Sequence, residues 1–154
     1  MAERSVTHAT FTLERSYDAP PAKVFKAFAD PAIKRRWFVE GEGWAVEEFT
    51  GEFKVGGFER SRFRFRGGEP IRNDTSYHDI VPNERIIFAY TMTIGENRIS
   101  ASLATCEFKP SGAGTRFIFT EQGAFLDGID DPAEREHGTN LMLDGLGAAL
   151  AEMP

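Results

Sequence analysis

Hydrophobic residues recur at every second position through most of the stretch from Trp44 to Gln122, which is the period of a strand with one buried face. The alternation is clearest over residues 52–55, 62–66 and 86–92, and clusters of glycine, proline and asparagine interrupt it at hairpin intervals. Short turns of this kind join antiparallel neighbours. The stretch therefore predicts a meander of about six strands.

Two short helices are expected before this stretch. A first strand at residues 10–17 is followed by the turn sequence DAPP, after which the apolar spacing becomes helical. Asp30 can cap a second helix whose first residue is Pro31, and this helix extends to Trp37. The chain thus predicts a strand and two short helices ahead of the meander.

A single long helix is expected at the end of the chain. Asp131, Pro132 and Glu134 have the form of a capping box with proline at the first helical position, and the helix can then run to about Glu152. About 20 residues span roughly 30 Å, enough to lie along a whole curved sheet. The inward stripe of this helix comprises Arg135, Thr139, Met142, Leu143, Leu146, Ala149 and Leu150.

The composition fits one domain, residues 1–154, with a real hydrophobic core, because 41% of the residues are hydrophobic and 14 are Phe. A net charge of -6 and a pI near 5.1 disfavour attraction to nucleic acid or to anionic lipid. One cysteine excludes an intramolecular disulfide and favours a reducing cytoplasm. We find no signal-peptide pattern and no apolar stretch long enough to span a membrane.

Five strings in a fixed order carry a family resemblance: APPAKVF (19–25), DPAIKRRWF (30–38), KVGG (54–57), DIVPNERIIF (79–88) and GTRFIFTEQG (114–123). With them the chain resembles the helix-grip, or SRPBCC, superfamily of START domains, polyketide cyclases and the pollen-allergen fold. A nearer resemblance is to its branch similar to the activator of Hsp90 ATPase, the AHSA1-like domains. It implies an α+β fold in which a curved antiparallel sheet of six to seven strands wraps around the C-terminal helix, with apolar or amphipathic molecules held between them.

Two positions depart from that branch. Its members often carry a Trp in the last helix where this chain has Thr139, and a His where this chain has Glu121. A bulky aromatic side chain is therefore missing, and an acid replaces a neutral or basic group. The resemblance implies a fold and leaves the substrate open.

The aromatic residues that share the inward parity of the strands are candidate walls of a ligand cavity. Periodicity alone favours an ordinary packed core for them, and the resemblance makes a cavity an equal alternative. Together with polar residues of inward parity, the ligand-binding candidates are Trp37, Phe53, Phe63, Phe65, Tyr77, Asp79, Phe88, Tyr90, Phe117, Phe119, Glu121, Arg135, Thr139 and Met142.

Three charged residues with inward parity are the candidates for chemistry. Glu121 continues a Phe-rich face, Asp79 shares the parity of Tyr77, and Arg135 points inward from the first turn of the last helix. A carboxylate beside an apolar cavity can act as a general acid or base. The alternative is an ion pair at the mouth of the cavity, such as Glu121 with Arg135, and this is the usual role of such residues.

Other motifs receive structural interpretations. Glu134 and His137 have the spacing of half a di-iron motif, but the second half is absent, so we expect no metal site and no cofactor. Cys106 lies in a strand pattern and is expected to be buried and inert. The basic stripe is interpreted as a solvated edge strand and not as a nucleic-acid site; it consists of Arg60, Arg62, Arg64 and Arg66.

Three functions stay open, in this order. The first is a carrier of a small apolar ligand, and the second is an interaction module acting on a chaperone or another protein partner. The third is an enzyme of the cyclase, hydrolase or dehydratase kind that uses Glu121 or Asp79. Leu141 projects away from the inward stripe and Trp37 ends a short helix, so either could contact a protein partner or a second copy in a homodimer.

Overall fold

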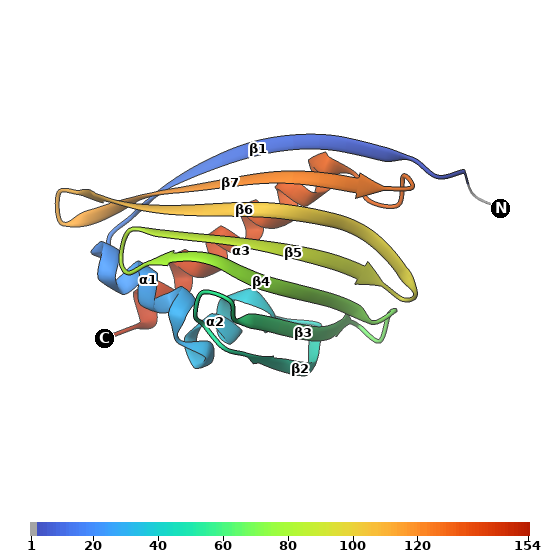
Figure 1. The fold of residues 1–154 in the computed structure, drawn as a ribbon. Coiled ribbons are helices and arrows are strands. Elements are labelled where there is room, and N and C mark those ends of the chain that lie inside the picture. The colour runs from blue at the N-terminus through green and yellow to red at the C-terminus, as the bar shows by residue number, and fades with distance from the viewer. Residues whose placement is uncertain (1–2) are drawn as a thin grey trace.

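The computed structural model describes residues 3–154, which form a seven-stranded antiparallel sheet with three helices on one face (Figure 1). The strands are β1 (Val6–Tyr17), β2 (Trp44–Gly51), β3 (Phe58–Phe65), β4 (Ile71–Val81), β5 (Arg85–Ile94), β6 (Asn97–Ser111) and β7 (Gly114–Leu126). The helices are α1 (Pro21–Ala29), α2 (Pro31–Phe38) and α3 (Pro132–Glu152). This is the α+β helix-grip fold that the family resemblance implied, and its element order is the one expected from the periodicities.

The strands lie in the order β1-β7-β6-β5-β4-β3-β2, so the six strands β2 to β7 form an unbroken meander and β1 adds to its end. Because β1 pairs along its whole length with β7, the first and last strands of the chain lie side by side. The open edges of the sheet are β1 and β2. The arginine-rich strand β3 is therefore not an edge strand, as the sequence suggested, since β2 pairs with it.

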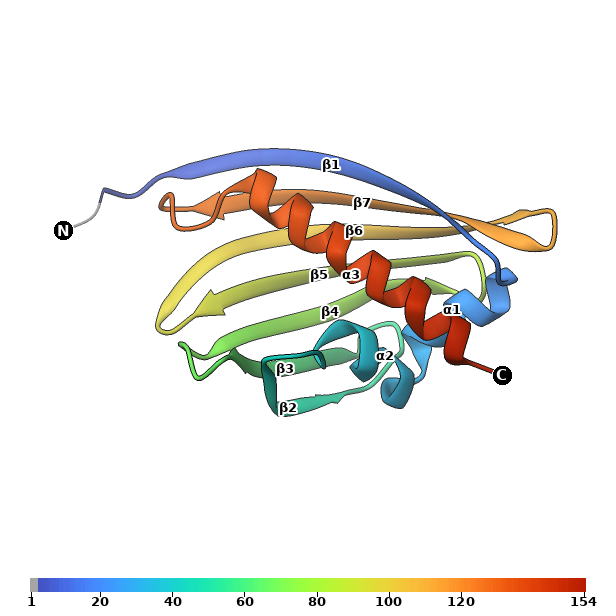
Figure 2. The same cartoon turned by 180° about the vertical axis from the view of Figure 1, so that it is seen from behind.

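The three helices begin at the signals expected from the sequence. The Asp30 side chain accepts a hydrogen bond from the backbone N–H of Ala32, at 3.0 Å, and Asp131 accepts one from Ala133 at 2.9 Å. Figure 2 shows α3 lying diagonally across the sheet from the β1–β7 edge toward α1. This placement makes the face of the sheet beneath α3 the inner face of the molecule.

Much of the hydrophobic core lies where α1 and the C-terminal half of α3 meet the sheet. Leu143, Leu146 and Leu150 of α3 are buried, as expected, and each contributes about 1.5–3 kcal/mol of burial free energy. The Phe117 ring is wholly buried and lies 5.3–6.0 Å from the rings of Phe28, Phe108 and Tyr17. The sequence placed Phe53 in a strand, but it lies in the turn between β2 and β3 and packs against Phe25.

Candidate functional site

The inner face of the sheet is divided into an apolar half and a polar half. The strand register sets two rows of inner side chains across β3 to β6, namely Glu59, Thr75, Tyr90 and Ser102 in one row and Ser61, Asn73, Met92 and Ser100 in the next. Seven of these eight residues carry a polar group that can hydrogen-bond through the side chain, in a layer that other sheets fill with aliphatic residues. The polar half lies toward the N-terminal half of α3, as the contacts of Arg135 below show.

Three inner side chains of β5 are partly exposed in a place where a packed core would bury them. β5 is the central strand, and its inner residue Ile86 is 1% exposed. The next three inner side chains, Phe88, Tyr90 and Met92, are only partly buried. We call these three side chains the inner strip. The helix layer therefore covers the centre of the sheet only in part.

Arg135 is the hub of a hydrogen-bonded network at one end of the inner strip. Its guanidinium donates to the Tyr90 hydroxyl at 2.9 Å, to Glu121 Oε2 at 3.2 Å and to the Ser100 hydroxyl at 2.8 Å. A further bond of 2.7 Å reaches Asp130, in the loop before α3. The side chain of Arg135 is 8% exposed, so its charge is held by two carboxylates in a largely dry site.

Glu121 is the most deeply buried member of this network, at 1% exposed. Besides Arg135, the Tyr90 hydroxyl donates to it at 2.8–2.9 Å and the Ser102 hydroxyl at 2.9 Å. The sequence offered two roles for Glu121, and these contacts correspond to the ion pair with Arg135. A carboxylate that accepts from three side chains is fixed in place, which suits a positioning group better than a mobile base.

A second buried ion pair, which the sequence reasoning missed, connects α2 to the sheet. Lys34 Nζ donates to both carboxylate oxygens of Glu59, at 2.8 and 2.9 Å, and to the Tyr77 hydroxyl at 3.3 Å. Burial alone would lower the pKa of Lys34, but Glu59 and Tyr77 outweigh it and hold that pKa above its usual value. A cavity of about 40 Å³ lies beside the pair, bordered by Phe28 among others.

A signal for this pair was present in the sequence. Glu59 has the same parity as Ser61 and Phe63, which places its carboxylate on the inner face of β3. Lys34 precedes the buried Trp37 by three positions, which places both on one face of α2. An inward acid and an inward base on neighbouring elements predict a buried pair.

The other candidate residues lie in three different environments. Trp37, Phe117 and Phe119 belong to the packed core, and the Trp37 indole donates to the Ala27 carbonyl at 3.0 Å. Phe63 and Thr139 are buried, and Met142 is partly buried on α3. Phe65 lies at the rim, 42% exposed, and its ring lies 4.8 Å from that of Trp44.

Asp79 does not point inward, and the expectation from parity is wrong at this residue. A β-bulge between Tyr77 and Asp79 adds one residue to β4, so Asp79 pairs with Ile87 and faces outward. There its carboxylate forms an ion pair with Arg85. Asp79 is therefore removed from the candidate site.

All three tyrosines of the chain, Tyr17, Tyr77 and Tyr90, have hydroxyls bonded inside the protein, and burial raises the pKa of each. The folded state therefore keeps protons that the unfolded chain releases near pH 10, so stability falls as the pH rises above that value. Each tyrosine contributes up to about 1.4 kcal/mol per pH unit.

We expect the ultraviolet absorbance of phenolate to stay low in the native protein above pH 10 and then to appear for all three tyrosines together, at unfolding. Circular dichroism recorded on the same samples locates the unfolding step. Gradual titration of one tyrosine in the folded protein would contradict the buried positions of these hydroxyls.

The Cys106 thiol, whose pKa burial raises to about 12, should likewise resist alkylation until the chain unfolds.

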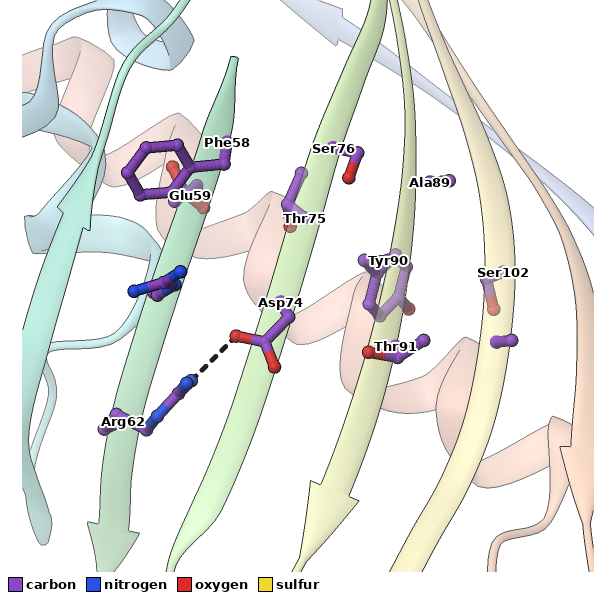
Figure 3. Close-up of a pocket in the computed structure, with 12 residues that line it drawn as sticks. Phe58, Glu59, Arg62, Asp74, Thr75, Ser76, Ala89, Tyr90, Thr91 and Ser102 are labelled. Carbon is purple, nitrogen blue, oxygen red and sulfur yellow. Dashed lines mark hydrogen bonds and ion pairs between the residues drawn. The ribbon is translucent and has the colours of Figure 1, made fainter. Parts of the chain in front are cut away.

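A separate hollow of about 530 Å³ lies on the outer face of the sheet, across β3 to β6 (Figure 3). In this view α3 lies behind the sheet. The floor of the hollow consists of small outward side chains, namely Ser76, Ala89, Thr91 and Ala101. Arg62 borders the hollow and pairs with Asp74 at 2.9 Å. The Arg60 guanidinium lies 5.1 Å from the centre of the Phe58 ring and has no carboxylate partner within residues 3–154.

Two further findings concern the part of the chain that the structure describes. None of the helices in residues 3–154 is both long and apolar enough to cross a membrane. The same residues contain no group of three or more His, Cys, Asp or Glu side chains arranged to hold a metal ion.

Comparison with known proteins gives one family and several solved structures. The family described as "Activator of Hsp90 ATPase homolog 1-like protein" matches residues 18–151. No curated protein matches the chain significantly.

The solved structures that resemble the chain include three bacterial proteins. A protein from Rhizobium loti is 52% identical, covers 94% of this chain and 99% of its own, and has a TM-score of 0.88. An uncharacterized protein from Rhizobium leguminosarum is 44% identical over 98% of this chain and 99% of its own, with a TM-score of 0.94. A protein from Chromobacterium violaceum is 25% identical over 92% and 96%, with a TM-score of 0.77.

Proposed function

The chain belongs to the family of activator of Hsp90 ATPase homolog 1-like proteins, and we propose that it binds a small amphipathic molecule between the sheet and α3. The observation that carries this proposal is the inner strip. Three large side chains on the covered face of the central strand, Phe88, Tyr90 and Met92, are only partly buried, where full burial would stabilise the fold. A ligand that covers them would supply the missing apolar contact.

The surroundings of the inner strip favour an amphipathic ligand over a purely apolar one. Toward α1 the inner face is aromatic and aliphatic, and toward the start of α3 it carries the polar rows and the Arg135 network. Ligand sites commonly combine apolar walls with a few fixed polar groups that orient the bound molecule. The apolar part would lie over Phe88 and Met142, with its polar end toward Tyr90.

Two measurements test this proposal. Native mass spectrometry of protein purified without added ligand should show a retained small molecule that is lost on unfolding. A titration with N-phenyl-1-naphthylamine, an uncharged fluorescent probe, should give saturable binding in protein from which that molecule has been removed. Failure of the stripped protein to bind the probe, with no retained molecule, would contradict the proposal.

A second function, as a protein-interaction module, is favoured by the outer hollow. Phe58 is 38% exposed beside Arg60, which has no carboxylate partner in the described part of the chain. The floor between these two residues and β6 consists of small side chains that leave room for a partner's side chains. The family description names an ATPase activator, so an Hsp90-class chaperone is the partner to test.

The test measures ATP hydrolysis by a purified bacterial Hsp90-class chaperone with and without this protein. Increased turnover that is lost in Arg60→Glu and Phe58→Ser would support the second function. Arg64→Glu is the matched control, because Arg64 lies on the same strand and pairs with Glu47 outside the hollow. Equal turnover in the presence and absence of the unmodified protein would contradict it.

A further inference from the structure

We infer that the molecule held over the inner strip is uncharged and that the two carboxylates on Arg135, Glu121 and Asp130, exclude anionic ligands from it. This inference rests on the proposed ligand-binding function and specifies the class of ligand. Its basis is the charge balance of the space between the sheet and the helices, where each cationic side chain supplied by residues 3–154 is paired with a carboxylate.

Three cationic side chains reach this space in the described part of the chain, and each has a carboxylate partner. Arg135 pairs with Glu121 and Asp130, at 3.2 and 2.7 Å. Lys34 pairs with Glu59 at 2.8 Å. Arg15 lies toward the other side of α3 and pairs with Asp144 at 3.1 Å. The charges of all three are therefore already met within the protein.

Around Arg135 the balance favours negative charge. Two carboxylates share one guanidinium, and both terminal nitrogens of that guanidinium already donate to other side chains. A carboxylate, sulfonate or phosphate placed over Tyr90 would lie near this negative cluster without a counter-ion, which is unfavourable. Hydroxyl and carbonyl groups meet no such penalty.

One donor on the inner face is free to serve an uncharged acceptor. The Ser61 hydroxyl is buried, in a residue 1% exposed, and finds no hydrogen-bond partner among residues 3–154. Ser61 pairs with Asn73 in the second polar row, which continues to Met92 of the inner strip. A buried hydroxyl without a partner costs stability, and a ligand carbonyl or hydroxyl that reached it would remove that cost.

Two probes that share one ring framework and differ by a sulfonate test the inference. N-phenyl-1-naphthylamine is uncharged, and 8-anilino-1-naphthalenesulfonate carries one negative charge. We expect the uncharged probe to bind at least about tenfold more tightly to the stripped protein and to be displaced poorly by the sulfonate.

Asp130→Asn should reduce the affinity ratio of the uncharged probe to the sulfonate probe to less than about threefold. The sulfonate should bind more tightly, because this change leaves Arg135 with one carboxylate in place of two. Glu121→Gln, which changes the buried partner of Arg135, should also strengthen sulfonate binding. Asp130→Asn is the variant expected to keep the fold, because Asp130 lies in a loop and is 18% exposed. Glu134→Gln is the control: it removes the same charge from the exposed first turn of α3, where Glu134 has no bond to Arg135.

The outcomes separate the two claims. Equal affinity of the two probes for the unmodified protein would overturn the inference and leave the ligand site standing. An equal effect of Asp130→Asn and Glu134→Gln would also overturn it, because the selectivity would then reflect the overall charge. No binding of the uncharged probe would remove both the inference and the proposed function.

Discussion

Lys34→Met is expected to lower the free energy of unfolding by about 3–5 kcal/mol, because it leaves the Glu59 carboxylate buried without its cation. Glu59 has a side chain 9% exposed and would keep the Tyr77 hydroxyl as its remaining partner. A single hydroxyl does not replace an ammonium group that donates to both carboxylate oxygens. Urea unfolding followed by fluorescence measures the change.

The double variant Lys34→Met with Glu59→Leu should recover most of that loss, because removing both charges of a buried pair leaves no orphan charge. Lys54→Met is the matched control, since Lys54 is 67% exposed in its pair with Glu52 and exposed pairs contribute about 0–1 kcal/mol. If Lys34→Met costs no more than this control, then Lys34 and Glu59 are solvated in solution and the pair does not hold α2 to the sheet.

The elements of the fold could be predicted from the sequence because each has a local signal. Periods of two and of 3.6 residues separate strands from helices, and an Asp followed by Pro marks the start of both α2 and α3. The same reasoning brought Glu121 and Arg135 together, since both lie in regular stretches where parity and helical spacing hold. Side-chain direction within a regular element is thus readable from one sequence.

The failures lie where a regular element is interrupted. One extra residue at His78 reverses the direction of every later side chain in β4, and this moved Asp79 to the outer face. Phe53 alternates like a strand residue but lies in a turn, where parity gives no direction. The Lys34–Glu59 pair joins residues 25 positions apart on different elements, so its two local signals became a contact only through the fold.

Whether the helix layer covers the inner strip could not be predicted from the sequence. An alternating aromatic pattern looks the same whether the opposite layer closes over it or stands away. Gly145 and Gly147 of α3 lie within 3.5 Å of the Trp37 carbonyl and the Tyr17 ring, measured from where a Cβ would be, so they serve close packing there. We therefore expect space between α3 and the sheet nearer the start of the helix, at Thr139.

Thr139→Trp is expected to weaken binding of N-phenyl-1-naphthylamine at least about tenfold while it lowers the free energy of unfolding by less than about 1 kcal/mol. Thr139 lies one turn after Arg135 on the sheet-facing stripe of α3, and its hydroxyl donates to the Arg135 carbonyl at 2.8 Å. An indole added at this position would extend over the inner strip and occupy the space proposed for the ligand. In a core packed at ordinary density the same change would cost about 1–3 kcal/mol instead.

Leu141→Trp provides the control for this experiment, because Leu141 is 58% exposed on the same helix and an indole there faces solvent. It should leave both the probe affinity and the urea midpoint unchanged. A Thr139→Trp protein that binds the probe normally and is clearly less stable would show that the helix already packs tightly against the sheet at this turn. The partly exposed side chains of β5 would then form only a shallow surface, and the outer hollow beside Phe58 and Arg60 would become the better candidate for the functional site.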